Sequence, residues 1–375
     1  MSIEFQKRLN AISGEERVVT IVDTVLAEVI RIAASDVHFE PTPDATEIKF
    51  RIDGVLRPIA RLPKEISHNL VARLKVMAEL LTYRTDIPQE GGLHAEDGQG
   101  AEMRVSTFPT VHGEKAVVRI FRAATPLTEL EHLGLNEELF DSLSGLLQER
   151  SGILFLTGPS GSGKTTTIYA CLRRLMRDRE GRHVVSIEDP VEQIIPGVTQ
   201  SQVRPGHEFD FARGLRSLLR QDPDVIMVGE IRDRETAAVA IEAALTGHLV
   251  ISTLHSGSAA GVVGRLLEMG IEPYLLTSSV RAILNQRLIR RRCGSCEGRG
   301  CEHCHNSGFR GRFLLAELLV PNAEFRRTVL AKADTESLAA VAASSGLRTI
   351  RIAAEDAVQA GTTTADEIRR VLGAS

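Results

Sequence analysis

Residues 158–165 constrain this chain more than any other stretch, because their letters, GPSGSGKT, fit the pattern G-x-x-x-x-G-K-[ST]. The apolar run of residues 153–157 precedes them, and residues 166–175 carry apolar side chains at helical spacing. A strand, a glycine turn and a helix in this order predict a loop whose backbone N–H groups surround an oxyanion at a helix N-terminus. A chance glycine turn before a lysine is the alternative, and both flanks argue against it.

This loop predicts a site for ATP with Mg²⁺. We expect Lys164 to neutralise the β- and γ-phosphates and Thr165 to bind Mg²⁺. The candidate nucleotide-binding residues are Gly158, Pro159, Ser160, Gly161, Ser162, Gly163, Lys164, Thr165 and Thr166.

Length and composition limit the remaining possibilities. A chain of 375 residues, 43% hydrophobic and 25% charged, is expected to fold into about two soluble domains. A net charge of −4, no Trp and three Tyr argue against a protein whose main task is binding nucleic acid. No apolar run approaches the ~20 residues that cross a bilayer, and the first residues lack the apolar core of a signal peptide. We therefore expect a cytoplasmic protein without direct membrane insertion.

A small α+β domain is predicted for residues 1–122. Apolar residues between Arg17 and Ala34 recur at three- and four-residue steps, which predicts an amphipathic helix. Asp53-Gly54, between two apolar runs, is a strong hairpin signal. Further patterns predict strands at 36–40, 47–52, 101–107 and 115–121 and a helix at 64–81. Residues 123–134 are predicted to be a linker, because Pro126 discourages a continuous helix.

The second predicted domain, residues 135–375, places polar side chains at the ends of apolar strands. Residues 183–187 lead into Glu188 and Asp189, and residues 224–228 lead through Gly229 into Glu230. Strand ends beside a phosphate loop are where open α/β sheets carry their chemistry. We expect Glu230 to act on the attacking water and Glu188 to position water or Mg²⁺, although an acidic turn is the alternative for Glu188.

Two histidines flank the next predicted strand, residues 249–253. His248 precedes it and His255 follows it. Either one is open to a structural explanation as a hydrogen-bonded core or turn histidine. We expect both to sense the γ-phosphate, since a hydrogen-bonding side chain at a strand end beside the phosphates can do so.

Four of the five cysteines are crowded together and predict a zinc knuckle within residues 290–312. Their spacing is Cys293-x2-Cys296-x4-Cys301-x2-Cys304, and four thiolates complete a structural tetrahedral Zn²⁺ site. Reduced free thiols without a metal are the alternative. His303 and His305 are the substitute ligands if one of the four cysteines does not bind the metal. The fifth, Cys171, is expected to be buried in the core.

Four motifs of the second domain resemble, in order, the Walker A, Asp box, Walker B and His box of the secretion ATPases, the motors of type II secretion and type IV pilus assembly. They are GPSGSGKTTT from Gly158, IEDPVE from Ile187, LRQDPDVIMVGEIRD from Leu219 and ALTGHLVISTLH from Ala244. The unusual Gly229-Glu230 belongs to that pattern. Segments of the first domain, such as ASDVHFE from Ala34 and FRIDG from Phe50, also resemble this family.

The resemblance implies a fold and further site residues. It implies a RecA-like motor domain behind the small α+β domain, with a zinc knuckle and C-terminal helices at residues 321–373. It makes Arg104 and Arg119 candidates to reach the nucleotide phosphates. Without the resemblance, solvation at the protein surface is the better explanation for both arginines. Secretion members carry a further N-terminal domain, and this chain is expected to be shortened there, with only about thirty residues before Ala34.

The same resemblance implies partners and rivals. It implies a hexamer acting on an inner-membrane platform protein, peripherally associated with the inner membrane, to assemble a secretion pseudopilus or pilus-like filament. The tetracysteine element is typical of assembly members, although its inner spacing here is short. A pilus-retraction ATPase, a RecA-like nucleic-acid translocase and a nucleotide-gated adaptor without turnover are the alternatives.

Overall fold

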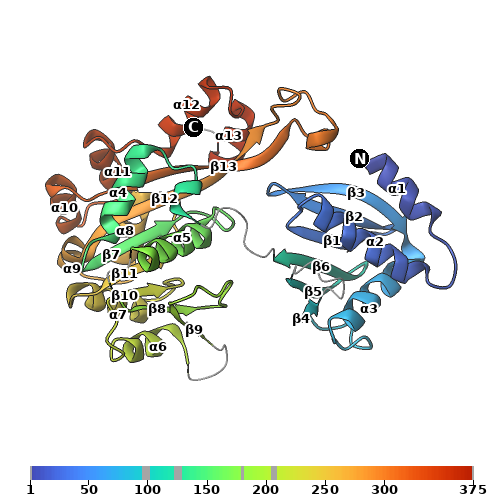
Figure 1. Cartoon of the computed structure of the whole chain (residues 1–375), viewed down its shortest axis with the longest axis horizontal. Coiled ribbons are helices and arrows are strands. Elements are labelled where there is room, and N and C mark those ends of the chain that lie inside the picture. The colour runs from blue at the N-terminus through green and yellow to red at the C-terminus, as the bar shows by residue number, and fades with distance from the viewer. Residues whose placement is uncertain (1, 95–101, 122–128, 179–180, 204–208, 374–375) are drawn as a thin grey trace. The chain divides into compact units, whose positions relative to one another are not determined.

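The computed structural model describes residues 2–94, 102–121, 129–178, 181–203 and 209–373, and the chain divides into two compact units (Figure 1). The first contains residues 1–125 and 292–311, and the second contains residues 126–291 and 312–375. The sequence placed the cysteine segment, residues 290–312, in the second domain, whereas residues 292–311 pack with the first unit. Part of the expected linker, residues 123–128, lies outside the described residues.

A six-stranded sheet in the order β3-β2-β1-β6-β5-β4 forms the centre of the first unit, and its neighbouring strands are antiparallel. The strands are β1 (Asp36–Pro41), β2 (Ala45–Ile52), β3 (Val55–Pro63), β4 (Gln89–His94), β5 (Glu102–Thr110) and β6 (Gly113–Phe121). The helices are α1 (Ser2–Ala11), α2 (Arg17–Arg31) and α3 (Ser67–Met77), with a 3-10 turn at Lys64–Ile66.

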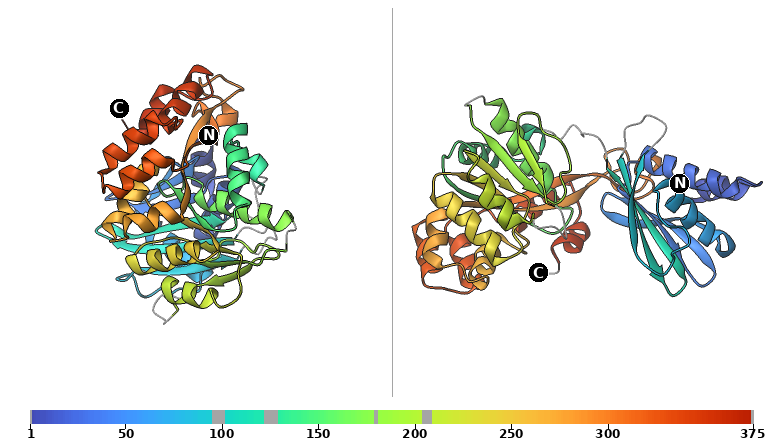
Figure 2. Two further views of the ribbon diagram at one scale, coloured as in Figure 1. Left: turned by 90° about the vertical axis from the view of Figure 1, so that its left-hand side faces the viewer. Right: turned by 90° about the horizontal axis from the view of Figure 1, so that it is seen from below.

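One face of this sheet carries the core of the first unit. Along β5, Met103, Val105 and Thr107 are buried, whereas the residues between them are exposed. The buried side chains of the strands join those of α1, α2 and α3 in one cluster, and the views show these helices on the same side of the strands (Figure 2). Alternation of apolar and polar residues is what a sheet covered on one face requires.

The hairpin predicted at Asp53-Gly54 joins β2 to β3. Both residues have positive φ, 49° and 81°, as a two-residue turn between twisted strands requires. The sequence patterns did not predict α1 and β4. The structure explains why: among residues 4–11 of α1, whose burial is described, Phe5 and Leu9 alone are fully buried, and β4 contains two adjacent glycines.

The second unit is built on a seven-stranded sheet in the order β13-β12-β7-β11-β10-β8-β9. The strands are β7 (Gly152–Thr157), β8 (Val184–Glu188), β9 (Thr199–Gln202), β10 (Val225–Val228), β11 (Leu249–Thr253), β12 (Val280–Arg292) and β13 (Phe309–Leu319). From β12 to β9, each strand runs parallel to its neighbour.

Helices cover both faces of this second sheet (Figure 1). They are α4 (Glu137–Leu147), α5 (Lys164–Arg177), α6 (Phe211–Leu218), α7 (Arg234–Leu245), α8 (Ala259–Glu268), α9 (Pro273–Ser279), α10 (Ala323–Leu330), α11 (Thr335–Ser344), α12 (Ile350–Gln359) and α13 (Ala365–Leu372), with a 3-10 turn at Leu130–His132. Every residue of β7, β8, β10 and β11 is buried, as expected for parallel strands between two helical layers. The predicted α/β architecture, a sheet domain preceded by a small α+β domain, is confirmed.

The cysteine segment connects β12 to β13 and packs within the first unit. The backbone N–H of Gly311 donates a hydrogen bond of 2.9 Å to Asp53 Oδ2, in the β2–β3 turn. The knuckle therefore contacts elements that the sequence had assigned to a separate domain.

Candidate functional site

The phosphate loop lies between β7 and α5, at the carboxyl edge of the second sheet. Its glycines adopt backbone conformations closed to other residues: φ is 140° at Gly158, 73° at Gly161 and 92° at Gly163. A Cβ on Gly158 would lie only 2.4 Å from the carbonyl oxygen of Gln286. Because α5 begins at Lys164, directly after Gly163, its N-terminal amides open onto this loop.

The polar side chains of the loop fit a phosphate ligand. Lys164 is 9% exposed, and its Nζ donates to the carbonyl oxygens of Gly158 (2.9 Å) and Pro159 (3.1 Å). Burial lowers the pKa of Lys164, which the nearby Glu230 charge raises and Arg287 lowers further. The hydroxyl of Ser162 is buried without a hydrogen-bond partner. A buried cation and an unsatisfied hydroxyl around a glycine cradle are the groups that a polyphosphate would satisfy.

Glu230 and His255 come from neighbouring strands to this same edge. Glu230 follows the end of β10, and His255 follows the end of β11. The His255 Nε2 atom lies 3.7 Å from Glu230 Oε2, and Arg232 pairs with the other oxygen of that carboxylate. The ion pair with Glu230 raises the pKa of Arg232. The structure thus brings together Lys164, Glu230 and His255.

Glu188 has a different environment from the one expected. It is 3% exposed, and its carboxylate accepts hydrogen bonds from Ser186 Oγ (2.6 Å), Tyr169 OH (2.5 Å) and Gln200 Nε2 (3.0 Å). Burial and the Glu188 carboxylate raise the pKa of Tyr169, so the phenol remains a neutral donor. A carboxylate with three protein donors is suited to holding structure in place, not to activating water.

Glu192 is a site residue that the sequence named only as part of a motif. The Tyr169 hydroxyl accepts the backbone N–H of Glu192 at 3.0 Å, and Glu192 Oε1 lies 3.4 Å from Thr165 Oγ1. The buried Glu188–Tyr169 pair therefore positions a second acid beside the expected Mg²⁺ ligand. The sequence signal for Glu192 is its position after Asp189 in the IEDPVE motif.

His248 is not part of this site. It precedes β11, where Leu249 pairs with Gly152 at the start of β7, and so it lies at the opposite edge of the sheet. Along β11, roughly 15 Å separates His248 from the sheet edge at the phosphate loop. From the turn that follows α7, its Nδ1 atom lies 3.0 Å from the carbonyl oxygen of Ala243, in the last turn of that helix. The structure therefore does not bring His248 to the phosphate loop, because parallel strands carry their two ends to opposite edges.

Arg104 and Arg119 belong to the first unit, where they face each other across β5 and β6 on the exposed face of the sheet. Their side chains are 50% and 66% exposed. Arg119 Nε donates to Asp36 Oδ1 at 3.0 Å, and Arg51 lies 3.4 Å from the other oxygen of that carboxylate. Arg104 lies over the Phe121 ring, 5.1 Å from its centroid. Like charges in direct cross-strand pairing repel each other, and here each arginine has a carboxylate beside it: Asp36 for Arg119, and Glu102, whose Oε1 lies 3.5 Å from Arg104 Nη2.

The four cysteines form a compact group. Sγ–Sγ distances are 3.8 Å for Cys293–Cys301, 3.8 Å for Cys296–Cys304 and 3.7 Å for Cys301–Cys304. Four sulfurs at about 2.3 Å from a tetrahedral Zn²⁺ would lie about 3.8 Å apart. Backbone N–H groups of Gly300 and Cys301 point at the sulfurs of Cys296 (3.3 Å) and Cys304 (3.1 Å). The thiols fit a zinc ion, and among the described residues no other group of three or more metal-binding side chains was found. Cys171 is buried within α5, as expected.

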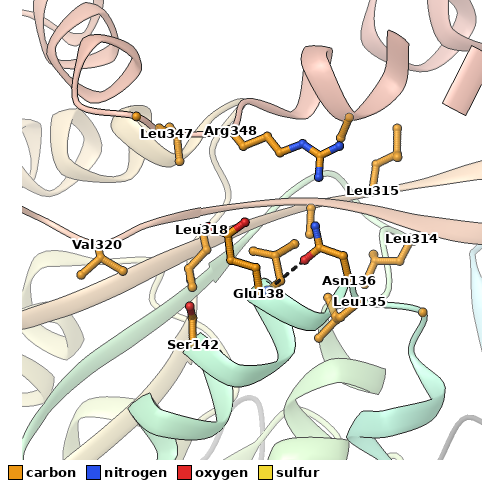
Figure 3. A pocket seen from close by; sticks show the side chains of 15 residues that line it. Leu135, Asn136, Glu138, Ser142, Leu314, Leu315, Leu318, Val320, Leu347 and Arg348 are labelled. Carbon is orange, nitrogen blue, oxygen red and sulfur yellow. Dashed lines mark hydrogen bonds between the residues drawn. The ribbon is translucent and has the colours of Figure 1, made fainter. Parts of the chain in front are cut away.

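A cavity of about 330 Å³ in the second unit lies apart from the phosphate loop (Figure 3). It opens between the first turns of α4, the strand β13 and the turn before α12. Leu135 and Leu318 line it with Arg348, whose guanidinium is paired with Asp356. None of the predicted nucleotide-binding residues lines this cavity.

Comparison with known proteins agrees with the geometry. A family model described as type II/IV secretion system protein matches residues 11–370. A putative type II secretion system protein E of Escherichia coli is 40% identical, over 96% of this chain and 77% of that protein. The type IV pilus assembly ATPase PilB of Thermus thermophilus is 39% identical, over 92% of this chain and 42% of its own length.

Solved structures extend the comparison. The pilus retraction motor PilT with bound ADP matches with a TM-score of 0.64 at 28% identity, over 94% of this chain and 96% of that chain. Within the described ranges, no helix is long and apolar enough to span a bilayer. The resemblance found in the sequence is confirmed: the chain belongs to the type II/IV secretion system protein family of secretion and pilus ATPases.

Proposed function

We propose that this chain is an ATP-hydrolysing motor that powers assembly of a type II secretion pseudopilus or a type IV pilus-like filament from the cytoplasmic side of the inner membrane. One observation carries the proposal: the phosphate loop and Glu230 lie at the same edge of the sheet. Glu230 is close enough to Lys164 for its charge to act on that lysine. The names of the relatives, protein E of type II secretion and an assembly ATPase, support the filament as the load.

The residues of the second unit have distinct roles in hydrolysis. The loop amides and Lys164 bind the phosphates. Thr165 and Glu192 would hold Mg²⁺, which neutralises phosphate charge when bound. Glu230 orients and deprotonates the attacking water, and His255 beside it responds to the γ-phosphate. Phosphoryl transfer needs little covalent chemistry from the protein, so the placement of these charges is the main catalytic contribution.

Residues outside this centre have supporting roles. Glu188 positions the Glu192 segment through Tyr169 instead of acting on water. We assign Arg104 and Arg119 to transition-state charge, because the family resemblance makes them candidates to reach the phosphates and both side chains are at least half exposed. Cys293, Cys296, Cys301 and Cys304 hold a structural Zn²⁺, which would fix a knuckle too short to have a core of its own.

The family resemblance supports a proposal for assembly and location. We propose that a hexamer converts nucleotide-driven motion into work on an inner-membrane platform protein, with peripheral attachment through that partner. Nucleic acid is not the expected load, since the net charge of the chain is −4.

A two-part experiment tests this function. The purified chain should release inorganic phosphate from ATP with Mg²⁺, and Lys164→Ala should abolish that release. In its own cells, loss of the gene should stop secretion or filament formation, and complementation with Lys164→Ala should fail. Equal phosphate release by both proteins would contradict the assigned ATPase site.

Retraction is the second candidate, favoured by the likeness to the retraction motor PilT. It predicts the opposite phenotype, since cells without the gene would accumulate surface filaments. A purified protein without zinc would also favour this candidate.

A further inference from the structure

A nearly buried guanidinium lies against the phosphate loop without an ion-pair partner. Arg287, on β12, is 8% exposed. Its Nη1 donates to Asn285 Oδ1 at 2.7 Å and to the carbonyl oxygen of Gln286 at 2.8 Å, and its Nη2 donates to the carbonyl oxygen of Gly257 at 2.7 Å. All three acceptors are neutral, and within the described part of the chain no carboxylate is close enough to form an ion pair with Arg287.

The sheet register explains why this guanidinium reaches the loop. The strand β12 is parallel to β7, with Asn285 opposite Thr157, so the next residues of β12 continue beside the first residues of the loop (Figure 1). A Cβ on Gly158 would lie 3.2 Å from Arg287 Nη1. Gly158 and Pro159 offer their carbonyl oxygens to Lys164. Lys164 and Arg287 therefore both lie against the backbone turn at Gly158.

Among the described residues neither cation forms a direct ion pair: the Glu230 charge acts on Lys164 without a hydrogen bond, and Glu317 reaches Arg287 only through Asn285. Buried charges in proteins are normally paired, because removing them from water is unfavourable. Burial lowers the pKa of Arg287, and Glu317 raises it only in part. The phosphates of a nucleotide are the anion that this turn is built to receive, so the counter-charge for Arg287 arrives with the ligand.

A hydrogen-bonded chain leads from Arg287 to two helix N-termini. Asn285 Nδ2 donates to Glu317 Oε1 at 2.9 Å, and Glu317 is 6% exposed. The same carboxylate accepts the backbone N–H of Ala259 at 3.3 Å and that of Ile350 at 2.8 Å. These are the first residues of α8 and α12. A change in the position of Arg287 thus bears directly on the groups that hold both helices.

We propose that Arg287 is a nucleotide-responsive positioning residue, whose missing counter-charge is supplied by bound phosphate and whose link through Asn285 and Glu317 carries the nucleotide state to α8 and α12. This inference rests on the proposed ATP site. The carboxyl half of β12 would then couple the nucleotide state at the phosphate loop to the C-terminal helices.

The first test compares Arg287→Met with a matched control, Arg281→Met. Arg281 is on the same strand but at the opposite sheet edge, where its Nε donates to the carbonyl oxygen of Ser151 at 3.0 Å. Titration of the full chain with a non-hydrolysable imido analogue of ATP should show binding weakened about tenfold to a hundredfold by Arg287→Met and unchanged by Arg281→Met. The rise in unfolding temperature on adding the analogue should shrink in Arg287→Met alone.

The second test follows backbone amide exchange with and without the analogue. In the wild type we expect the analogue to change exchange by several-fold at residues 259–261 and 350–352. Arg287→Met and Glu317→Gln should lose that change at saturating analogue. Arg287→Lys serves if the methionine variant fails to fold: it keeps the charge, so binding should weaken less than tenfold, but it lacks the fork that reaches both Asn285 and Gly257, so the exchange response should be lost.

The outcomes separate this inference from the proposed function. Wild-type protein that binds and hydrolyses ATP while Arg287→Met binds the analogue equally well would overturn the inference and leave the function intact. An unchanged exchange response in Arg287→Met and Arg287→Lys would do the same. Wild-type protein that fails to bind ATP would instead remove the site on which both depend.

Discussion

Cations of two kinds occur in the two units of this chain. In the second unit, Lys164 and Arg287 are almost completely buried beside the phosphate loop and donate to backbone carbonyls. In the first unit, Arg104 and Arg119 are at least half exposed on a sheet face, where Glu102 pairs with Arg104 and Asp36 pairs with Arg119. The buried pair is held by backbone carbonyls, whereas the exposed pair is held by surface carboxylates and remains open to solvent.

The difference shows how far burial can identify a ligand site. A buried unpaired cation destabilises the empty protein, so its presence implies a bound anion in the working state. An exposed arginine has no such cost, and exposure alone therefore says nothing about its function. Arg104 and Arg119 face each other across two strands, but Glu102 and Asp36 offset that repulsion, so the candidacy of the two arginines rests on the family resemblance.

The largest effect should come from the acid that accompanies the buried cations. Glu230→Gln keeps the size of the side chain but removes the base, so we expect phosphate release to fall by about 10⁴-fold. Nucleotide affinity should stay within a few-fold of the wild type, since Lys164 and the loop are untouched. Steady-state phosphate release and analogue binding measure the two quantities. Wild-type turnover in this variant would show that the base lies elsewhere.

The exposed pair should affect turnover without affecting stability. Arg119→Ala and Arg104→Ala are expected to lower kcat by about 10³-fold, as removal of a transition-state arginine does in related NTPases. The unfolding midpoint should change little, because both side chains are solvated. Arg61→Ala is the matched control: Arg61 is 58% exposed on the same sheet and paired with Asp44, so its loss should leave kcat unchanged. Equal kcat in all three variants would reduce Arg104 and Arg119 to surface charges.

The cysteine group extends the comparison to buried sulfur in the first unit. We expect one zinc per chain in the purified protein, and Cys293→Ser should remove it and lower the unfolding midpoint by about 10 °C. Cys171→Ala is the control, because Cys171 is buried outside the group, and its zinc content should equal that of the wild type. Metal analysis and thermal unfolding measure both. A wild-type protein without zinc would mean that the four thiols are held together by the fold alone.

Much of the second unit could be predicted from sequence because its signals are local. The loop residues are contiguous, and the apolar strands before Glu188 and Glu230 are short runs between polar ends. The parallel sheet then determines which strand ends meet. Applying that rule to both ends of β11 would have excluded His248 in advance, since only the carboxyl end lies beside the loop.

Other features depend on contacts between distant segments, which no local pattern reports. Arg287 is 123 positions after Lys164 in the sequence, and only the pairing of β12 with β7 brings the two together. The hydrogen bonds that occupy Glu188 come from three different elements. The cysteine segment was assigned to the wrong neighbour in space for the same reason, because it is continuous with β12 and β13 in sequence but packs with residues near Asp53.

The smallest effect should separate the two histidines. His255 lies 3.7 Å from Glu230 Oε2, so His255→Gln removes a partner of the catalytic acid and should lower kcat about tenfold. His248 lies in the turn after α7, where its Nδ1 atom is 3.0 Å from the carbonyl oxygen of Ala243 and 3.4 Å from Thr246 Oγ1, so His248→Gln should keep kcat within twofold. Phosphate release at saturating ATP gives both values. A tenfold loss in His248→Gln with normal stability would mean that the far edge of the sheet also takes part in turnover, and the comparison between buried and exposed charges would then have to include a third region.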